Sequence, residues 1–295
     1  MDLKIVGAGQ LGVRLAVLWK AKFPDSSIYL KTNHKNHERS SKWESLGFKA
    51  LSTEEENDSN RITTPFVAFC APPTNNPNYA NDIHASIQND WKYNSTDDKG
   101  FVFTASGGVY VENSGGVIDE DSEVSSDSVR GKSTERSKLL LSAEQIVLKN
   151  NGVVVRLGAL YTKTSGAHTF WLSDDKSNEV SSSPNGWINL IHYDDAARCV
   201  MAALLDPPKP ESKRLLLASD GTPMTRENIC KAALMCPMFQ HKKLPNFVGN
   251  QKYVDGKRYK TSLILQTLDW NPIYHSFEDF MLNHYNKEMN VAMFW

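Results

Sequence analysis

The feature that most constrains the fold is a glycine turn close to the start of the chain. Residues 7–12 (GAGQLG) follow the apolar run LKIV and lead into a helical pattern over Leu11 to Lys22. In such a unit the first glycine permits the tight turn, the second lets a diphosphate approach the backbone, and the third lets helix and strand pack closely. The free N–H groups and the positive dipole end of the helix would hold the phosphates. The pattern therefore predicts dinucleotide binding, against the alternative of a tight turn without a ligand. The predicted contacts are Gly7, Gly9, Gln10, Leu11 and Gly12.

Apolar runs alternate with helical patterns along most of the chain. The strand candidates SIYLKT, PFVAFCA, GFVFTAS and GVVVRLGAL are separated by helical segments, and WINLIH and RLLLAS continue the series. This alternation predicts an α/β fold, a Rossmann-type doubly wound parallel sheet with right-handed crossovers. The pattern breaks down after Tyr161 and again after Thr222, which predicts a smaller C-terminal substrate lobe. We therefore expect a dinucleotide-binding domain of residues 1–160 and 187–220, and a small lobe of residues 161–186 and 221–295.

The composition limits the classes of partner that this chain is expected to bind. A net charge of -1 over 295 residues gives no basic excess for nucleic acid or an anionic membrane. No apolar stretch approaches the roughly 20 residues that span a bilayer. Because a strand and the glycine turn occupy the start, we expect no signal peptide and a cytoplasmic protein, or an organellar one if a transit peptide has been removed. The four cysteines have no metal-ligand spacing, so we expect no metal site. Both a monomer and an oligomer fit this composition.

The segment that leaves the second predicted strand favours NADP over NAD. An NAD site usually carries Asp or Glu here, where the carboxylate accepts a hydrogen bond from the ribose 2′-hydroxyl. Asp25 lies at the wrong end of SIYLKT, and the following segment instead carries hydroxyl, amide and cationic side chains. Such donors suit a 2′-phosphate, so we expect Thr32, Asn33 and Lys35 to contact the cofactor. NAD stays the alternative cofactor, and a solvated basic loop stays the alternative role of the segment.

Three further stretches resemble the extended short-chain dehydrogenases/reductases, the NAD(P)-dependent epimerase/dehydratase group. FVFTASGGVYVENSGG is similar to the family's fifth-strand motif, VVVRLGALY to its sixth strand, and INLIHYDDAARCVMAAL to its segment that leads into a helix. The narrow glycine spacing, WINLIHYDD and YVDGKRYKTSLILQTLDW resemble the atypical YeeZ-like branch. The resemblance extends from Lys4 to about Phe280. It implies that the cofactor runs along Cys70, Ala71, Pro72 and Ala105.

The resemblance also implies an active site of Ser or Thr, Tyr and Lys, with the tyrosine four residues before the lysine. Ser106 matches the serine and Lys138 matches the lysine, which would also hold the nicotinamide ribose, but Thr134 stands at the tyrosine position. A threonine hydroxyl has a pKa far above that of a phenol, so a neighbouring ammonium does not make it a useful acid or base near neutral pH. The alternatives to these catalytic roles are structural: Ser106 would tie down a turn, and Lys138 would be an exposed residue of the helix. The candidates to replace the phenol, each with a packing or hydrogen-bonding role as the alternative, are Tyr110, Tyr161 and His192.

Two functions are compatible with these residues. The first is an NAD(P)-dependent oxidoreductase or epimerase/dehydratase-like enzyme that acts on a small polar metabolite. The second is a non-catalytic NADP(H)-binding sensor or scaffold protein. A substrate would lie between the carboxyl edge of the sheet and the small lobe. There, Lys252, Lys257 and Arg258 either meet an anionic group or are solvated surface charges.

Overall fold

A seven-stranded parallel sheet forms the centre of the molecule. The computed structural model describes residues 1–34, 36–56, 59–92, 100–124, 134–173 and 179–294. The strand order is β12-β7-β5-β4-β1-β2-β3, and every neighbouring pair is parallel. This order confirms the doubly wound Rossmann-type fold predicted from the alternation. The strands are β1 (Leu3–Val6), β2 (Ile28–Thr32), β3 (Lys49–Ser52), β4 (Phe66–Phe69), β5 (Gly100–Ser106), β7 (Val153–Leu157) and β12 (Leu215–Ala218).

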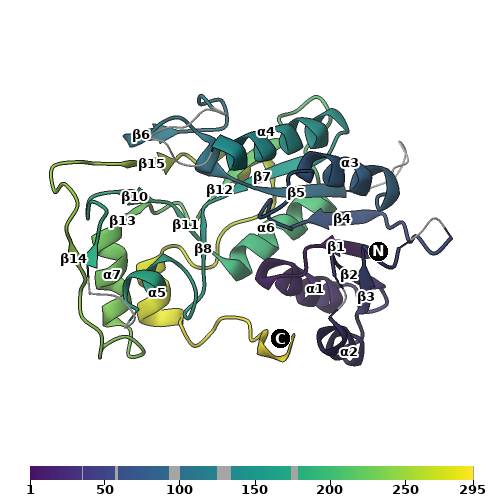
Figure 1. Cartoon of the computed structure of the whole chain (residues 1–295), viewed down its shortest axis with the longest axis horizontal. Coiled ribbons are helices and arrows are strands. Elements are labelled where there is room, and N and C mark those ends of the chain that lie inside the picture. The colour runs from purple at the N-terminus through teal and green to yellow at the C-terminus, as the bar shows by residue number, and fades with distance from the viewer. Residues whose placement is uncertain (35, 57–58, 93–99, 125–133, 174–178, 295) are drawn as a thin grey trace.

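Helices cover both faces of this sheet (Figure 1). On one face lie α1 (Gln10–Lys22) and α6 (Tyr193–Leu205), and on the other lie α3 (Tyr79–Asn89) and α4 (Thr134–Lys149). The central strands are apolar on both faces because both are buried beneath helices. At the edge beside β3, α2 (His37–Ser45) packs against the C-terminal turn η3 (Ala292–Phe294). The last residues of the chain therefore return to the large sheet.

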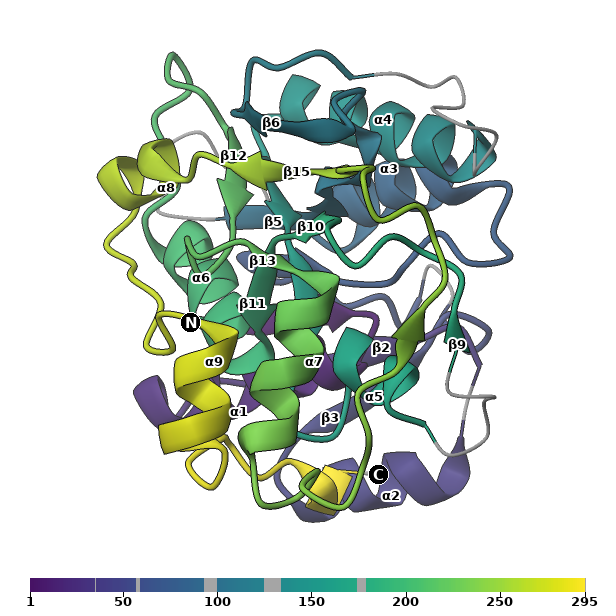
Figure 2. The same cartoon turned by 90° about the vertical axis from the view of Figure 1, so that its left-hand side faces the viewer.

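The second lobe is built around a small sheet of order β13-β10-β15-β6. Its strands are β6 (Ser114–Ile118), β10 (Trp187–Ile188), β13 (Met224–Thr225) and β15 (Gly256–Tyr259). Figure 2 shows α7 and α9 side by side below this sheet, where they share a core with η2. The remaining helical elements are α5 (Ala167–Trp171), α7 (Arg226–Met235), α8 (Ser262–Thr267), α9 (Phe277–Asp279), the 3₁₀ turn η1 (Gly107–Val109) and the π-helical η2 (Phe280–His284).

Two short parallel pairs complete the lobe, β8 (Ala159–Tyr161) with β11 (Leu190–His192), and β9 (Glu179–Val180) with β14 (Asn246–Phe247). The division into residues 1–160 with 187–220 and residues 161–186 with 221–295 stays a prediction. Pairing crosses that division, because β6 joins β15, and α8 packs against β12. Among the described helices, none combines the length and apolar composition that crossing a bilayer requires.

Candidate functional site

The three glycines of the turn between β1 and α1 have different surroundings in the structure. Gly7 has a φ of +90°, and a Cβ at this position would overlap the backbone nitrogen of Ala71. A Cβ on Gly12 would lie 2.7 Å from the carbonyl oxygen of Gly7 and 2.8 Å from Cγ2 of Ile5. A Cβ on Gly9 would meet no atom within 4 Å. Gly7 and Gly12 are therefore required by packing, whereas Gly9 borders open space.

The amino end of α1 faces this open space without a side-chain cap. Gly9 occupies the N-cap position, and no side chain among the described residues caps it. The first N–H groups of a helix have no partner within the helix, so those of residues 10–12 are available to an anion. The Gln10 side chain is held elsewhere, because its Oε1 accepts a hydrogen bond of 2.5 Å from Arg14 Nη1. Arg14 in turn donates through Nε to Asp194 Oδ1 at 2.8 Å.

A cavity of about 330 Å³, here called the central cavity, lies directly beside this turn. It is at the carboxyl edge of the sheet, where open α/β sheets bind their ligands. It brings together most of the predicted cofactor contacts and the predicted catalytic serine. Its lining residues are Gly7, Gly9, Gln10, Leu11, Cys70, Ala71, Pro72, Pro73, Thr104, Ala105, Ser106, Arg136, Leu140, Leu157, Gly158, Leu160 and Tyr193.

Ser106 ends β5 and has two roles in the structure. Its Oγ accepts a hydrogen bond of 3.2 Å from the N–H of Gly108, which caps the turn η1. Its side chain also borders the central cavity. Ser106 therefore ties down the turn and also borders the central cavity. A hydroxyl that accepts a hydrogen bond from the backbone keeps its own proton to donate.

The structure does not bring Lys138 to the central cavity. Its ammonium lies 3.6 Å from Glu135 Oε1, and 48% of its side chain is exposed. Arg136 and Leu140 of the same helix line the cavity instead. Residues four apart share a helix face, whereas Lys138 is two positions away and so lies roughly opposite. Thr134 is the first residue of α4, and its side chain lies outside what the structure describes.

The three candidates to replace the phenol line none of the described cavities. Tyr161 and His192 are fully buried in the second lobe beside Phe280. His192 caps α6 through Nδ1, which accepts from the N–H of Asp194 at 3.1 Å. Tyr110 is buried beneath the guanidinium of Arg156, 4.7 Å from its ring centroid. The packing and hydrogen-bonding alternatives hold for these three residues.

The segment after β4 forms one wall of the central cavity. Tyr79 donates a hydrogen bond of 2.6 Å to the carbonyl oxygen of Ala71, which fixes the segment against α3. Burial raises the pKa of the Cys70 thiol to about 12. This thiol is protonated near neutral pH, which excludes a nucleophilic role there.

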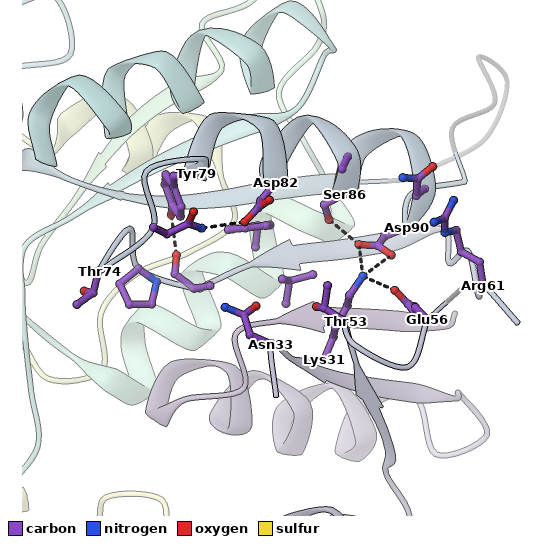
Figure 3. A pocket seen from close by; sticks show the side chains of 17 residues that line it. Lys31, Asn33, Thr53, Glu56, Arg61, Thr74, Tyr79, Asp82, Ser86 and Asp90 are labelled. Carbon is purple, nitrogen blue, oxygen red and sulfur yellow. Dashed lines mark hydrogen bonds and ion pairs between the residues drawn. The ribbon is translucent and has the colours of Figure 1, made fainter. Parts of the chain in front are cut away.

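A second cavity of about 190 Å³, here called the edge cavity, continues from the first beyond Ala71 and Pro72, which line both. Figure 3 shows its side chains arriving from the ends of β2 and β3 and from α3. Asn33 and Thr53 lie on the sheet side, and Thr74 belongs to the segment that follows β4. The two cavities together form a path from the carboxyl end of β2 to Ser106.

Buried charges form the far wall of the edge cavity. Lys31 forms an ion pair with Glu56 and lies 3.2 Å from Asp90 Oδ1, as Figure 3 shows. Lys4 joins the cluster, 2.8 Å from Asp90 and 3.2 Å from Glu56. Ser86 donates to Asp90 Oδ2 at 2.8 Å. Because two ammonium groups face two carboxylates, Lys31 is not a free cation for a phosphate.

Of the three predicted 2′-phosphate contacts, the structure places Asn33 in the lining of the edge cavity. Asn33 is exposed. Thr32 donates its hydroxyl proton to the carbonyl oxygen of His34 at 2.9 Å and does not line the cavity. Lys35 lies outside the described residues.

A third cavity of about 230 Å³, here called the lobe cavity, adjoins the central cavity on the side of the second lobe. Ser106, Leu157 and Gly158 line both cavities. Its other lining residues are Gly107, Gly108, Ala159, Trp187, Ile188, Asn189, Gly256, Lys257 and Tyr259. This is the predicted position of a substrate, between the carboxyl edge of the sheet and the small lobe.

Sequence reasoning missed three polar side chains of the central cavity, Thr104, Arg136 and Tyr193. Only the helical phase of α4 distinguishes Arg136 from its neighbours. Tyr193 follows His192 in the IHYDD segment, and no local pattern in the sequence assigns this tyrosine to the cavity. The cavity places it at the first residue of α6 beside Gln10 and Leu11.

Compared by sequence, the chain matches no protein-family model and no curated protein. Compared by structure, it is similar to dTDP-glucose 4,6-dehydratase from Bacillus anthracis in complex with NAD, with a TM-score of 0.71, 12% identity and coverage of 100% of this chain and 98% of that one. UDP-glucuronic acid 4-epimerase from Bacillus cereus in complex with NAD gives 0.70, 16%, 97% and 98%. A conserved protein of unknown function from Silicibacter pomeroyi gives 0.71, 18%, 97% and 98%. The chain thus has the fold of NAD-dependent epimerases and dehydratases over its whole length, as the resemblance in sequence implied.

Proposed function

We propose that this chain is an NADP-dependent oxidoreductase or epimerase/dehydratase-like enzyme that acts on a small polar metabolite. The observation that carries the proposal is the open space at Gly9. It lies at the uncapped amino end of α1 and in the same cavity as Ser106. A residue with a side chain at position 9 would fit the protein alone, so the glycine there is explained by a ligand that approaches the backbone.

The residues of the central and edge cavities fit a dinucleotide. The N–H groups of Gln10, Leu11 and Gly12 bind the diphosphate at the positive end of α1. Leu140, Leu157 and Leu160 provide apolar surface that excludes water around the nicotinamide end. When bound, the cofactor supplies a hydride donor or acceptor. Ser106 donates a hydrogen bond to the reacting oxygen of the substrate.

The adenosine end would enter the edge cavity beside Asn33 and Thr53. At the end of β2, Thr32, Asn33 and His34 present no carboxylate that could accept from a ribose 2′-hydroxyl. Among the neighbouring acids, Glu54 is exposed and contacts His34 at 2.6 Å, and Glu56 and Asp90 are paired with lysines. These side chains favour a 2′-phosphate, with Asn33 and Lys35 as its proposed donors.

Fluorescence titration tests both binding and preference, because the seven tryptophans provide an intrinsic signal. NADPH is expected to bind at least about tenfold more tightly than NADH, a difference of about 1.4 kcal/mol. A response to NADH alone would reverse the cofactor assignment. If neither nucleotide changed the fluorescence or the unfolding temperature, the dinucleotide proposal would fail.

The second candidate is a non-catalytic NADP(H)-binding sensor or scaffold. The observation that favours it is the position of Lys138, which pairs with Glu135 and does not line the central cavity. Stopped-flow oxidation of bound NADPH against a panel of carbonyl compounds separates the two. The panel includes 4-keto sugar nucleotides, because the similar Bacillus cereus epimerase was solved with UDP-glucuronic acid and NAD. NADPH that binds and is never oxidised would favour the sensor.

The four cysteines are free thiols, which supports the proposal of a reducing compartment such as the cytoplasm. Localisation of the tagged full-length chain by microscopy and fractionation tests this directly. Recovery in an oxidising compartment would contradict it.

A further inference from the structure

Two side chains of strand β15 line the lobe cavity together with Ser106. β15 runs between β6 and β10 in the second sheet, as Figure 1 and Figure 2 show. Side chains alternate between the two faces of a strand, so Lys257 and Tyr259 project from the same face. A lysine and a phenol therefore border the same space as the serine at the end of β5.

The hydroxyl of Tyr259 packs directly against Gly107, the residue that follows Ser106. A Cβ at position 107 would overlap this phenol oxygen. The close approach is thus available only with glycine there. It places the phenol beside the backbone that carries the predicted catalytic serine.

Lys257 is half-buried and contacts Tyr110, the residue that follows the turn η1. Its Nζ donates a hydrogen bond of 2.5 Å to the carbonyl oxygen of Tyr110. Burial lowers the pKa of Lys257 from its ordinary 10.5 to about 8, and the charge of Glu112 opposes this shift only in part.

Asn189 fixes the backbone of both residues. Its Nδ2 donates to the carbonyl oxygen of Lys257 at 2.8 Å, and its Oδ1 accepts from the N–H of Tyr259 at 2.8 Å. Asn189 is itself buried and is one of the lining residues of the cavity. One amide thus holds the strand segment in a single position, and such preorganisation is what a catalytic site requires.

We infer that Lys257 and Tyr259 handle the proton in place of the phenol that is missing at position 134. Tyr259 and Ser106 hold the reacting oxygen of a substrate with a secondary alcohol or a ketone, and Lys257 exchanges its proton. The inference rests on the proposed function, which supplies the hydride acceptor or donor.

In the oxidising direction the substrate loses one proton and one hydride. The substrate O–H bond breaks, and its proton forms an N–H bond on the neutral Lys257 amine, which becomes an ammonium. The electron pair of the adjacent C–H bond leaves with its hydrogen as hydride to the oxidised nicotinamide, and the carbon–oxygen bond becomes double. In the reducing direction the Lys257 ammonium returns the proton to the oxygen.

The environments of the two side chains explain this division of roles. Burial raises the pKa of Tyr259, with Tyr110 adding to the shift and the Arg156 guanidinium opposing it. Arg156 is itself held by Glu144. The Tyr259 hydroxyl therefore stays a donor at neutral pH, whereas the amine has the pKa near working pH that suits proton transfer.

Competitive labelling of lysines with acetic anhydride, read by peptide mass, tests the site without a known substrate. Lys257 is expected to reach half of its maximal reactivity at about pH 8, with exposed Lys260 as the internal reference. With NADP⁺ bound its midpoint should fall by about half a unit relative to NADPH, because the oxidised ring carries a positive charge. An unreactive Lys257, or one whose midpoint is the same with both nucleotides, would overturn the inference.

Single-turnover oxidation of bound NADPH by phenanthrenequinone, an activated dicarbonyl, tests proton transfer. Lys257→Met is expected to slow oxidation by about 100-fold or more and Tyr259→Phe by about tenfold or more, whereas Lys260→Met matches the wild type. NADPH affinity, measured by fluorescence, should be unchanged in all three variants. Variants as fast as the wild type would overturn the inference alone. A wild type that binds NADPH but is inert would overturn the inference and favour the non-catalytic candidate. A wild type that does not bind NADPH would overturn the proposed function and this inference with it.

Discussion

The substitution Gly9→Ser separates the proposed ligand role of the glycine turn from its structural role. A side chain at position 9 meets no atom of the protein within 4 Å, and φ at this residue is -82°, so the substitution causes no strain. Serine is also a slightly better N-cap than glycine, by a few tenths of a kcal/mol. The free energy of unfolding is therefore expected to stay the same or to rise by about 0.3 kcal/mol.

The same side chain would occupy the space through which a diphosphate reaches the N–H groups of α1. Loss of one charge-assisted hydrogen bond costs about 1.5–3 kcal/mol, which corresponds to a loss of affinity for NADPH of about tenfold to about 150-fold. Fluorescence titration measures the affinity, and urea unfolding measures the stability of the same preparation.

Gly108→Ala provides the matched control. Its new Cβ would lie 3.4 Å from Ser106 Oγ, an ordinary contact, and Gly108 lines the lobe cavity rather than the central cavity. NADPH affinity should stay unchanged in this variant. If Gly9→Ser bound NADPH within about twofold of the wild type, at unchanged stability, the diphosphate would not lie at the amino end of α1.

Asp90→Asn should destabilise the fold by about 3 kcal/mol in urea unfolding, because it leaves the Lys4 ammonium buried with only part of its compensating charge. Asp82→Asn, at an exposed position two turns earlier along α3, should stay within about 0.5 kcal/mol, and equal effects would contradict a structural role for the cluster. Burial lowers the pKa of His168 from 6.5 to about 4, so the unfolded chain binds the proton first and this residue's contribution to stability is lost as pH falls from about 6.5 to about 4. The difference in unfolding free energy between the wild type and His168→Leu should therefore shrink by about 2–3 kcal/mol over that interval, whereas a constant difference would show that the residue does not titrate. Thr134→Tyr should leave NADPH affinity unchanged in fluorescence titration, because the proposed diphosphate contacts lie at the glycine turn, and a loss of about tenfold would show that position 134 does not correspond to the family's tyrosine.

The regular part of the large sheet could be predicted from local pattern. Runs such as LKIV and PFVAFCA are apolar on both faces, and a strand between two helical layers buries both faces of such a run. β3 was missed because Lys49–Ser52 is short and lies at the sheet edge, where one neighbour suffices and polar side chains are tolerated. β15 was missed for a similar reason, since GKRY carries no apolar alternation.

The candidate site divides in the same way between local and distant determinants. The sequence by itself predicted the glycine turn, because the strand, the three glycines and the helix follow one another directly in the chain, and it predicted Ser106, which ends the fourth predicted strand. Only the tertiary structure decided that Arg136 rather than Lys138 lines the central cavity, since a helix phase error of two residues turns a side chain to the opposite face. It also brought Lys257 and Tyr259 to Ser106, about 150 residues away in the chain. Contacts over such a separation depend on how the second sheet packs on the first, and that packing is set by whole surfaces rather than by any local motif.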